Sequence, residues 1–123
     1  MKLYNLYKDS NLLDYIKCRI DDKYIINNGV ILEDGYNILG YILYNIEVKN
    51  DKKIAHIDYL FIEEDNLLEI ILNKFYNKLK YLKFNLILNS INIDIDLINR
   101  YIDLKYKLFN ILYTKYILYK NIL

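Results

Sequence analysis

The sequence predicts an α+β domain built on one mixed, mostly antiparallel sheet with helices packed against it. Segments that alternate apolar and polar residues, as strands do, are interleaved with segments whose apolar residues recur at helical spacing. Hydrophobic residues make up 54% of the 123 residues, which is ample for one core. No stretch rich in Pro, Gly or Ser divides the chain, so we expect residues 1–123 to form a single domain.

The first two predicted elements are a strand and a helix. Residues 1–8 alternate as an edge or half-buried strand does, and Asp9 and Ser10 carry oxygen atoms suited to cap a helix. The helix is expected over residues 11–22, and Cys18 is expected to lie near the core. The apolar residues that recur at helical spacing in it are Leu12, Leu13, Ile16 and Ile20.

Three strands follow and predict an antiparallel meander. They cover residues 30–32, 38–49 and 54–62, and polar turns at 33–35 and 50–53 separate them. A helix then begins at Leu67. Its apolar stripe consists of Leu67, Leu68, Ile71, Leu72, Phe75 and Leu79.

The last predicted elements are a strand, a helix and a strand. Residues 84–89 form a short apolar run, and Asp94 or Asp96 is suited to cap the next helix. The inward face of that helix carries Leu97, Ile98, Tyr101 and Leu104. A final strand is expected over residues 108–119, with a break near Thr114. The predicted order is therefore β-α-β-β-β-α-β-α-β.

Composition and charge exclude several classes of function. Seventeen Lys and Arg against sixteen Asp and Glu give a net charge of +1, without the basic excess that nucleic-acid binding needs. Asn, Lys or Asp interrupts every apolar run well short of a membrane span. The lone Cys18 cannot form an internal disulfide, and the first residues lack the pattern of a signal peptide. We expect a soluble cytoplasmic protein.

Three short segments occur in an informative order and spacing. Residues 37–43 place a Gly after a short apolar run, residues 54–62 form a long apolar strand, and residues 100–106 end the last helix with a Tyr near its start. Together with the element order, these segments resemble the GNAT superfamily of N-acetyltransferases. The last segment departs from the Tyr-x-x-x-Gly-Phe ending of that family, because Lys105 replaces Gly and Tyr106 replaces Phe.

The resemblance implies a cofactor, a reaction and a set of site residues. Acetyl-CoA would enter between the fourth and fifth strands and pair its pantetheine arm with the backbone of Leu60, Phe61 and Ile62. An unidentified primary amine would attack the thioester directly. His56 would accept the amine proton through water, and Tyr101 would protonate the CoA thiolate.

Each of these roles has a structural alternative. His56 also fits a hydrogen-bonded, inert histidine on a strand. In a chain with 15 tyrosines, Tyr101 also fits core packing with its hydroxyl at the rim. Asp58 shares the strand parity of His56, so it either orients the imidazole or belongs to a solvated face, and the solvated face is favoured.

An acidic turn stands where the family has a Gly-rich loop that binds the acetyl-CoA pyrophosphate. Glu63, Glu64 and Asp65 occupy this connection. We expect them to cap the following helix and to oppose a phosphate by about 1–3 kcal/mol each within about 5 Å. The phosphate-binding loop is therefore expected to be degenerate. We assign no metal, because no His or further spaced ligand accompanies the carboxylates.

A second hypothesis is a non-catalytic GNAT-fold module that binds a protein partner or dimerises. It predicts that side chains close the cleft between the central strands. Tyr113, Tyr116 and Tyr119 near the C-terminus favour a homodimer through an outer strand. The chain has 15 tyrosines in all, and a gene biased towards A and T encodes many of them, so this bias accounts for the C-terminal tyrosines nearly as well.

Overall fold

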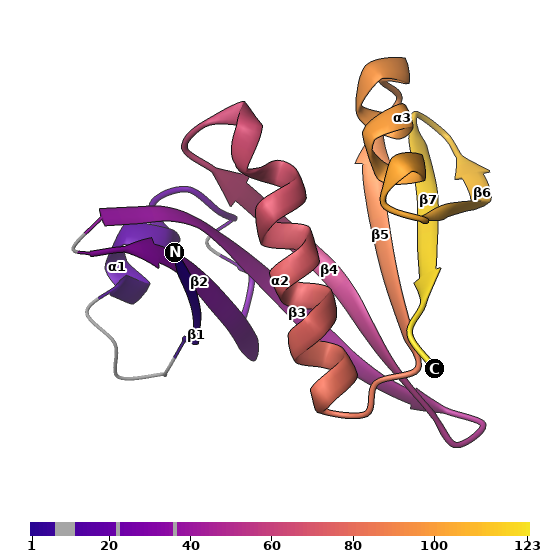
Figure 1. Ribbon diagram of the computed structural model, residues 1–123, viewed down its shortest axis with the longest axis horizontal. Coiled ribbons are helices and arrows are strands. Elements are labelled where there is room, and N and C mark those ends of the chain that lie inside the picture. The colour runs from indigo at the N-terminus through magenta and orange to yellow at the C-terminus, as the bar shows by residue number, and fades with distance from the viewer. Residues whose placement is uncertain (7–11, 22, 36) are drawn as a thin grey trace.

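The computed structural model describes residues 1–6, 12–21, 23–35 and 37–123, which form one seven-stranded sheet with helices on both faces (Figure 1). The strand order is β1-β2-β3-β4-β5-β7-β6. Only β4 and β5 pair in parallel, and the other neighbouring strands are antiparallel. The predicted α+β class with a mixed, mostly antiparallel sheet is confirmed.

The N-terminal elements agree with the predicted order. They are β1 (Lys2–Asn5), α1 (Leu12–Lys17), β2 (Asn28–Asp34), β3 (Asn37–Lys49) and β4 (Lys52–Ile62). The predicted caps at residues 9 and 10, and both predicted ends of the first helix at residues 11 and 22, lie outside the described residues. The prediction that Cys18 lies near the core is wrong. Cys18 follows the end of α1 and is exposed, with its Sγ 3.1 Å from the carbonyl oxygen of Tyr15.

The C-terminal elements add one strand to the prediction. They are the 3-10 turn η1 (Asp65–Leu67), α2 (Leu68–Tyr81), β5 (Leu86–Asn92), α3 (Ile95–Asp103), β6 (Lys107–Leu112) and β7 (Lys115–Asn121). The predicted last strand is a hairpin, because Tyr113 adopts a left-handed φ of 54° and reverses the chain. Asp94 caps α3 and accepts hydrogen bonds from two backbone N–H groups. No described helix is long and apolar enough to cross a membrane.

The sheet separates two apolar clusters. The larger cluster lies under α2 and α3, and all six residues of the predicted α2 stripe are buried. On the opposite face, Ile16 of α1 packs on Ile31, Tyr41 and Leu43. Alternate residues of β2, β3 and β4 therefore serve two different cores, which explains the long apolar runs in these strands.

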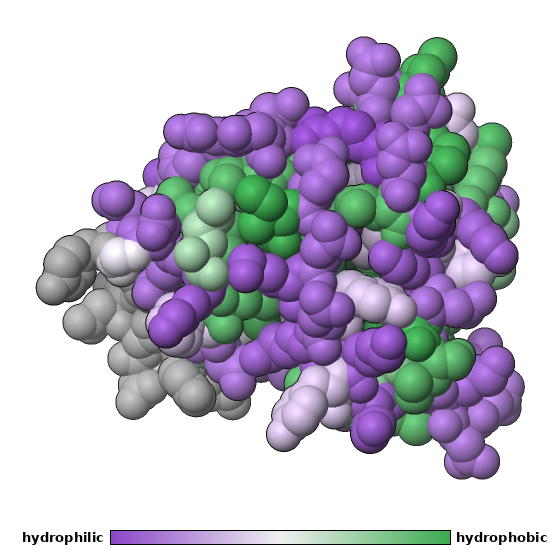
Figure 2. All heavy atoms as spheres, viewed as in Figure 1, coloured by the Kyte–Doolittle hydropathy of each residue, from purple (hydrophilic) through white to green (hydrophobic). Residues whose placement is uncertain are grey.

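The strand β6 forms one outer edge of the sheet and is exposed along its whole length. Apolar side chains nevertheless dominate it. Those with exposed fractions between 50% and 68% are Leu108, Phe109, Ile111 and Leu112. Figure 2 shows apolar residues reaching the surface at the side of the molecule where α3, β6 and β7 lie.

Candidate functional site

The sheet opens between its two parallel strands. β4 and β5 pair from Ile54 with Leu86 to Ile57 with Asn89, and the pairing then stops. From residue 58 to residue 62, β4 pairs with β3 on one side and with no described strand on the other. This half of β4 therefore presents a free backbone edge.

A β-bulge marks the point where the strands separate. Tyr44 of β3 pairs with Ile57, whereas the preceding Leu43 pairs with Tyr59. Asp58 is thus one extra residue on β4. A bulge bends its strand and increases the local twist, which carries β4 away from β5.

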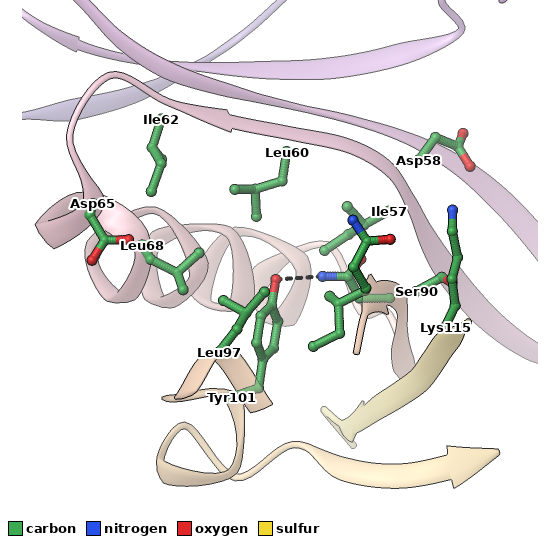
Figure 3. Close-up of a pocket in the computed structure, with 13 residues that line it drawn as sticks. Ile57, Asp58, Leu60, Ile62, Asp65, Leu68, Ser90, Leu97, Tyr101 and Lys115 are labelled. Atoms are coloured by element: carbon green, nitrogen blue, oxygen red, sulfur yellow. Dashed lines mark hydrogen bonds between the residues drawn. The ribbon is translucent and has the colours of Figure 1, made fainter. Parts of the chain in front are cut away.

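A cavity of about 330 Å³ occupies the opening between the two strands (Figure 3). Leu60, Ile62 and Leu68 give it an apolar side, and Asp65 lies at one end. Asp58, Ser90 and Lys115 lie at the opposite end, and the hydroxyl of Tyr101 points into the space between. The residues that complete the lining are Ile57, Asn89, Ile91, Asn92 and Leu97.

Tyr101 supplies a buried hydroxyl to this cavity. Its side chain is 2% exposed, and its oxygen accepts a hydrogen bond from Nδ2 of the buried Asn89 at 2.6 Å. Burial raises the pKa of Tyr101 well above its ordinary value of 10.0, so the phenol keeps its proton at neutral pH. Because Asn89 is the donor in this bond, the O–H of Tyr101 remains available to donate to a ligand.

Asp58 is held in place from the other face of the sheet. Its Oδ2 accepts hydrogen bonds from the hydroxyl of Tyr24 at 2.6 Å and from Nδ2 of Asn45. The ring of Tyr24 packs edge-on against Tyr59, with centroids 5.0 Å apart. Burial and the bond to Asp58 raise the pKa of Tyr24, so this phenol remains the donor. Asn45 is the cross-strand partner of His56, so His56 and Asp58 share a face, as predicted.

His56 lies outside the cavity lining. Its Nε2 is 2.5 Å from Oε2 of Glu47, and its side chain is 35% exposed. Its neighbours Ala55 and Ile57 belong to the core under α2, which also contains Tyr101. The alternation of β4 therefore points His56 to the opposite face from Tyr101. The catalytic roles of these two residues stay predictions.

The three predicted pantetheine-contacting residues divide between the two faces. Leu60 and Ile62 line the cavity, whereas the Phe61 ring stacks on Tyr41 in the other core, with centroids 5.4 Å apart. Phe61 reaches the cavity side only through its backbone. Contact of all three with a ligand also stays a prediction.

The acidic turn is short, and its carboxylates do not cap the helix as predicted. Only Glu63 and Glu64 connect β4 to η1, and neither η1 nor α2 has a side-chain cap. Glu63 accepts a hydrogen bond from the hydroxyl of Tyr15 at 2.6 Å. Asp65 accepts one from Arg100. Long-range partners have therefore taken two of the carboxylates that the sequence assigns to local capping.

Arg100 clamps the start of α2 to α3 beside the cavity. Its Nε and Nη2 donate to both oxygens of Glu69 at 2.6 and 2.9 Å, and its Nη1 donates to Asp65 at 2.8 Å. These hydrogen bonds lower the pKa of Glu69. The sequence analysis did not identify Arg100 or Asn89 as site residues. The available signal for Asn89 was an amide directly after the apolar run at residues 86–88.

The comparisons with solved structures identify this architecture. No family model matches the chain, and no curated protein matches its sequence. Naa50 of Arabidopsis thaliana, bound to a bisubstrate analogue, is 15% identical with a TM-score of 0.74, covering 98% of this chain and 99% of its own. The spermidine/spermine N-acetyltransferase SpeG of Vibrio cholerae is 12% identical with a TM-score of 0.77, covering 98% and 95%.

A third similar structure extends the match over the whole chain. An aminoglycoside 6'-N-acetyltransferase complexed with coenzyme A is 12% identical with a TM-score of 0.74, covering 100% of this chain and 98% of its own. The second and third of these proteins are N-acetyltransferases by description, and at these identities the likeness of all three establishes the fold. The chain has the GNAT fold, as the short segments of its sequence predicted.

Proposed function

We propose that this protein is a GNAT acyltransferase that moves an acetyl group from a pantetheine thioester, such as acetyl-CoA, to a primary amine. The observation that carries the proposal is the cavity beside the free edge of β4, with the hydroxyl of Tyr101 inside it. The alternative of a non-catalytic module predicts a cleft closed by side chains, and the open cavity favours a bound ligand.

The free edge of β4 suits the pantetheine arm. Residues 58–62 present backbone N–H and C=O groups on the side away from β3. The two amides of pantetheine pair with such an edge as an added strand does. Leu60, Ile62 and Leu68 provide apolar contact for the methylene groups of the arm.

The two residues that we propose to handle protons, Tyr101 and His56, lie on opposite faces of the sheet. The amine nitrogen attacks the thioester carbonyl carbon, the C–N bond forms, and the C–S bond breaks with its electron pair on sulfur. Tyr101 donates its O–H to that sulfur from the α3 side. His56 takes the amine proton through water from the opposite face, because Nε2–H donation to Glu47 leaves Nδ1 as acceptor. Asp58, at the cavity end, attracts the protonated amine before attack.

Ligand binding to the folded protein tests this proposal. Acetyl-CoA at millimolar concentration is expected to raise the melting temperature and to give a saturable heat in calorimetry. Leu60→Trp, which fills the cavity, abolishes both effects. Val48→Trp, on an exposed part of β3, is the matched control and preserves them. Binding that survives Leu60→Trp places the ligand elsewhere and contradicts the proposal.

The exposed edge strand favours a second candidate function, namely self-association through β6. Two copies related by a two-fold axis would pair β6 with β6 in antiparallel fashion and cover the apolar side chains of both. Light scattering after gel filtration is expected to give a dimer mass. Phe109→Lys shifts that mass to a monomer, whereas Ile25→Lys, at an exposed apolar residue between α1 and β2, does not. A monomeric wild-type protein contradicts this function.

A further inference from the structure

We infer that the site recognises its acyl donor through the pantetheine arm alone and gains nothing from the phosphates of CoA. The inference rests on the proposed function and names the class of donor. Donors of this class are neutral or weakly charged pantetheine thioesters, in which no anionic distal group is needed for binding. The inference follows from the charges at one end of the cavity.

The arm leaves the cavity at the start of α2. Tyr101 lies between the two ends of the cavity, with Asp58 and Lys115 at one end and Asp65 at the other (Figure 3). With the thioester at Tyr101 and the amine at Asp58, the remainder of the donor runs past Ile62 towards Asp65. A helix begins there, and a helix N-terminus ordinarily attracts an anion through its dipole and free N–H groups.

Asp65 lines that exit, and three further carboxylates lie close to it along the chain and oppose the attraction. Glu63, Glu64, Asp65 and Glu69 lie on the turn and the first residues of the helices, and Arg100 is the cation bound to two of them. These five charges leave a formal excess of three negative charges. The hydroxyl bonded to Glu63 belongs to Tyr15, whose pKa that hydrogen bond raises, so Tyr15 stays neutral and adds no cation to this group.

Arg100 is not free to bind a phosphate. Its Nε, Nη1 and Nη2 all donate to Glu69 or to Asp65, including a bond of 2.6 Å from Nη2 to the carbonyl oxygen of Asp65. A phosphate that recruited this guanidinium would release two carboxylates beside itself. The exchange replaces one anion with another and provides no net attraction.

Two consequences are measurable. S-acetyl-pantetheine, which has no phosphate, is expected to bind with a dissociation constant within about threefold of that of acetyl-CoA. Salt screens repulsion between exposed charges, so acetyl-CoA binding is expected to tighten between about 0.05 M and about 0.5 M salt. Binding of S-acetyl-pantetheine is expected to stay constant over the same range.

The experiment titrates both thioesters into the full chain by calorimetry at both salt concentrations, with release of free thiol as a second readout. Glu64→Gln removes an exposed carboxylate that makes no side-chain cap and is expected to tighten acetyl-CoA binding about threefold at low salt. Asp51→Asn is the matched control, since Asp51 is equally exposed but lies in the β3–β4 turn. It is expected to leave both affinities unchanged.

The outcomes separate this inference from the proposed function. Acetyl-CoA bound more than threefold tighter than S-acetyl-pantetheine, with weaker binding at high salt, overturns the inference and leaves the proposed function standing. An equal response of Glu64→Gln and Asp51→Asn also overturns the inference. If neither thioester binds, the proposed function fails and the inference fails with it.

Discussion

The two halves of β4 belong to one strand but have different surroundings. From Ile54 to Ile57, β4 lies between two paired strands, and Ala55 is completely buried. From Asp58 to Ile62 it has one neighbouring strand, and its side chains are exposed or only partly buried. The first half is paired on both sides, and the second half borders the cavity in which we propose that the donor binds. A single bulge at Asp58 marks the change from a fully paired half of the strand to a half with a free edge.

The largest expected difference is in the cost of removing apolar side chains. Ile87 of β5 is completely buried beside the paired half, so Ile87→Ala should reduce the free energy of unfolding by about 2–5 kcal/mol. Leu60→Ala in the open half should cost less than about 2 kcal/mol because the cavity already borders Leu60. Urea denaturation measures both values. Equal losses would mean that the open half contributes to stability as much as the paired half.

A backbone contact beneath the open half gives the next largest effect. Gly40 of β3 pairs with Ile62, and a Cβ at Gly40 would overlap the carbonyl oxygen of Phe61 and lie 3.3 Å from Cα of Ile62. Gly40→Ala is expected to destabilise by about 1–3 kcal/mol because backbone has to move.

The control for this contact is Gly29, where the atoms nearest to an added Cβ belong to the side chains of Leu6 and Leu43, at 3.0 to 3.2 Å. Side-chain ends move more readily than backbone, so Gly29→Ala is expected to cost less than Gly40→Ala in the same denaturation experiment. The reverse order would show that β3 and β4 have more freedom at the open half than the close contact allows.

Two buried tyrosines allow a matched test of the cavity hydroxyl. Tyr101 and Tyr106 are each 2% exposed and pack edge to face, with ring centroids 5.0 Å apart. Tyr101 has Asn89 as a partner, whereas the buried hydroxyl of Tyr106 has no hydrogen-bond partner among the described residues. Tyr101→Phe is expected to cost about 1–2 kcal/mol and to slow acetyl transfer, and Tyr106→Phe is expected to be neutral or stabilising.

Thermal unfolding together with the rate of thiol release checks both tyrosine variants. A larger loss of stability from Tyr106→Phe would indicate that its hydroxyl has a partner after all. Unchanged turnover in Tyr101→Phe would remove the proposed role of that hydroxyl in protonating or stabilising the thiolate.

The smallest effect concerns the clamp at the cavity exit. The pKa of Glu69 is depressed in the folded state, so its bond to Arg100 stabilises the protein fully at pH values above the ordinary pKa of 4.5. This stabilisation is lost as the pH falls through the lower pKa of the folded protein. Arg100→Gln is expected to lower stability by about 1 kcal/mol or less at pH 7. The two proteins should converge near pH 3, and melting curves across that range measure it. A constant difference at all pH values would show that the clamp acts through packing instead.

The fold could be predicted from local patterns, and the site largely could not. The apolar stripe of α2 and the alternation of β3 and β4 depend on residues close in sequence, so both could be predicted from the sequence. The pairs Arg100 with Glu69, Asn89 with Tyr101 and His56 with Glu47 join different elements, so they depend on how the helices and strands pack together.

The carboxylates of the turn show the same limit. Local rules assigned Glu63 and Asp65 to helix capping, and tertiary partners took them instead. The break near Thr114 was predicted, but its nature as a hairpin was not, because no Gly or Asn marks the left-handed residue Tyr113.

The bulge at Asp58 also acts as a phase shift in the sequence. Before it, even-numbered residues of β4 such as His56 face α1, and after it odd-numbered residues such as Tyr59 and Phe61 do. Deleting residue 58 would restore a regular alternation in which Leu60 and Ile62 still face the cavity, because the bulge absorbs one residue. An alignment to a strand without the bulge therefore needs a gap at this position, and without it the two faces of the strand are exchanged for every residue that follows.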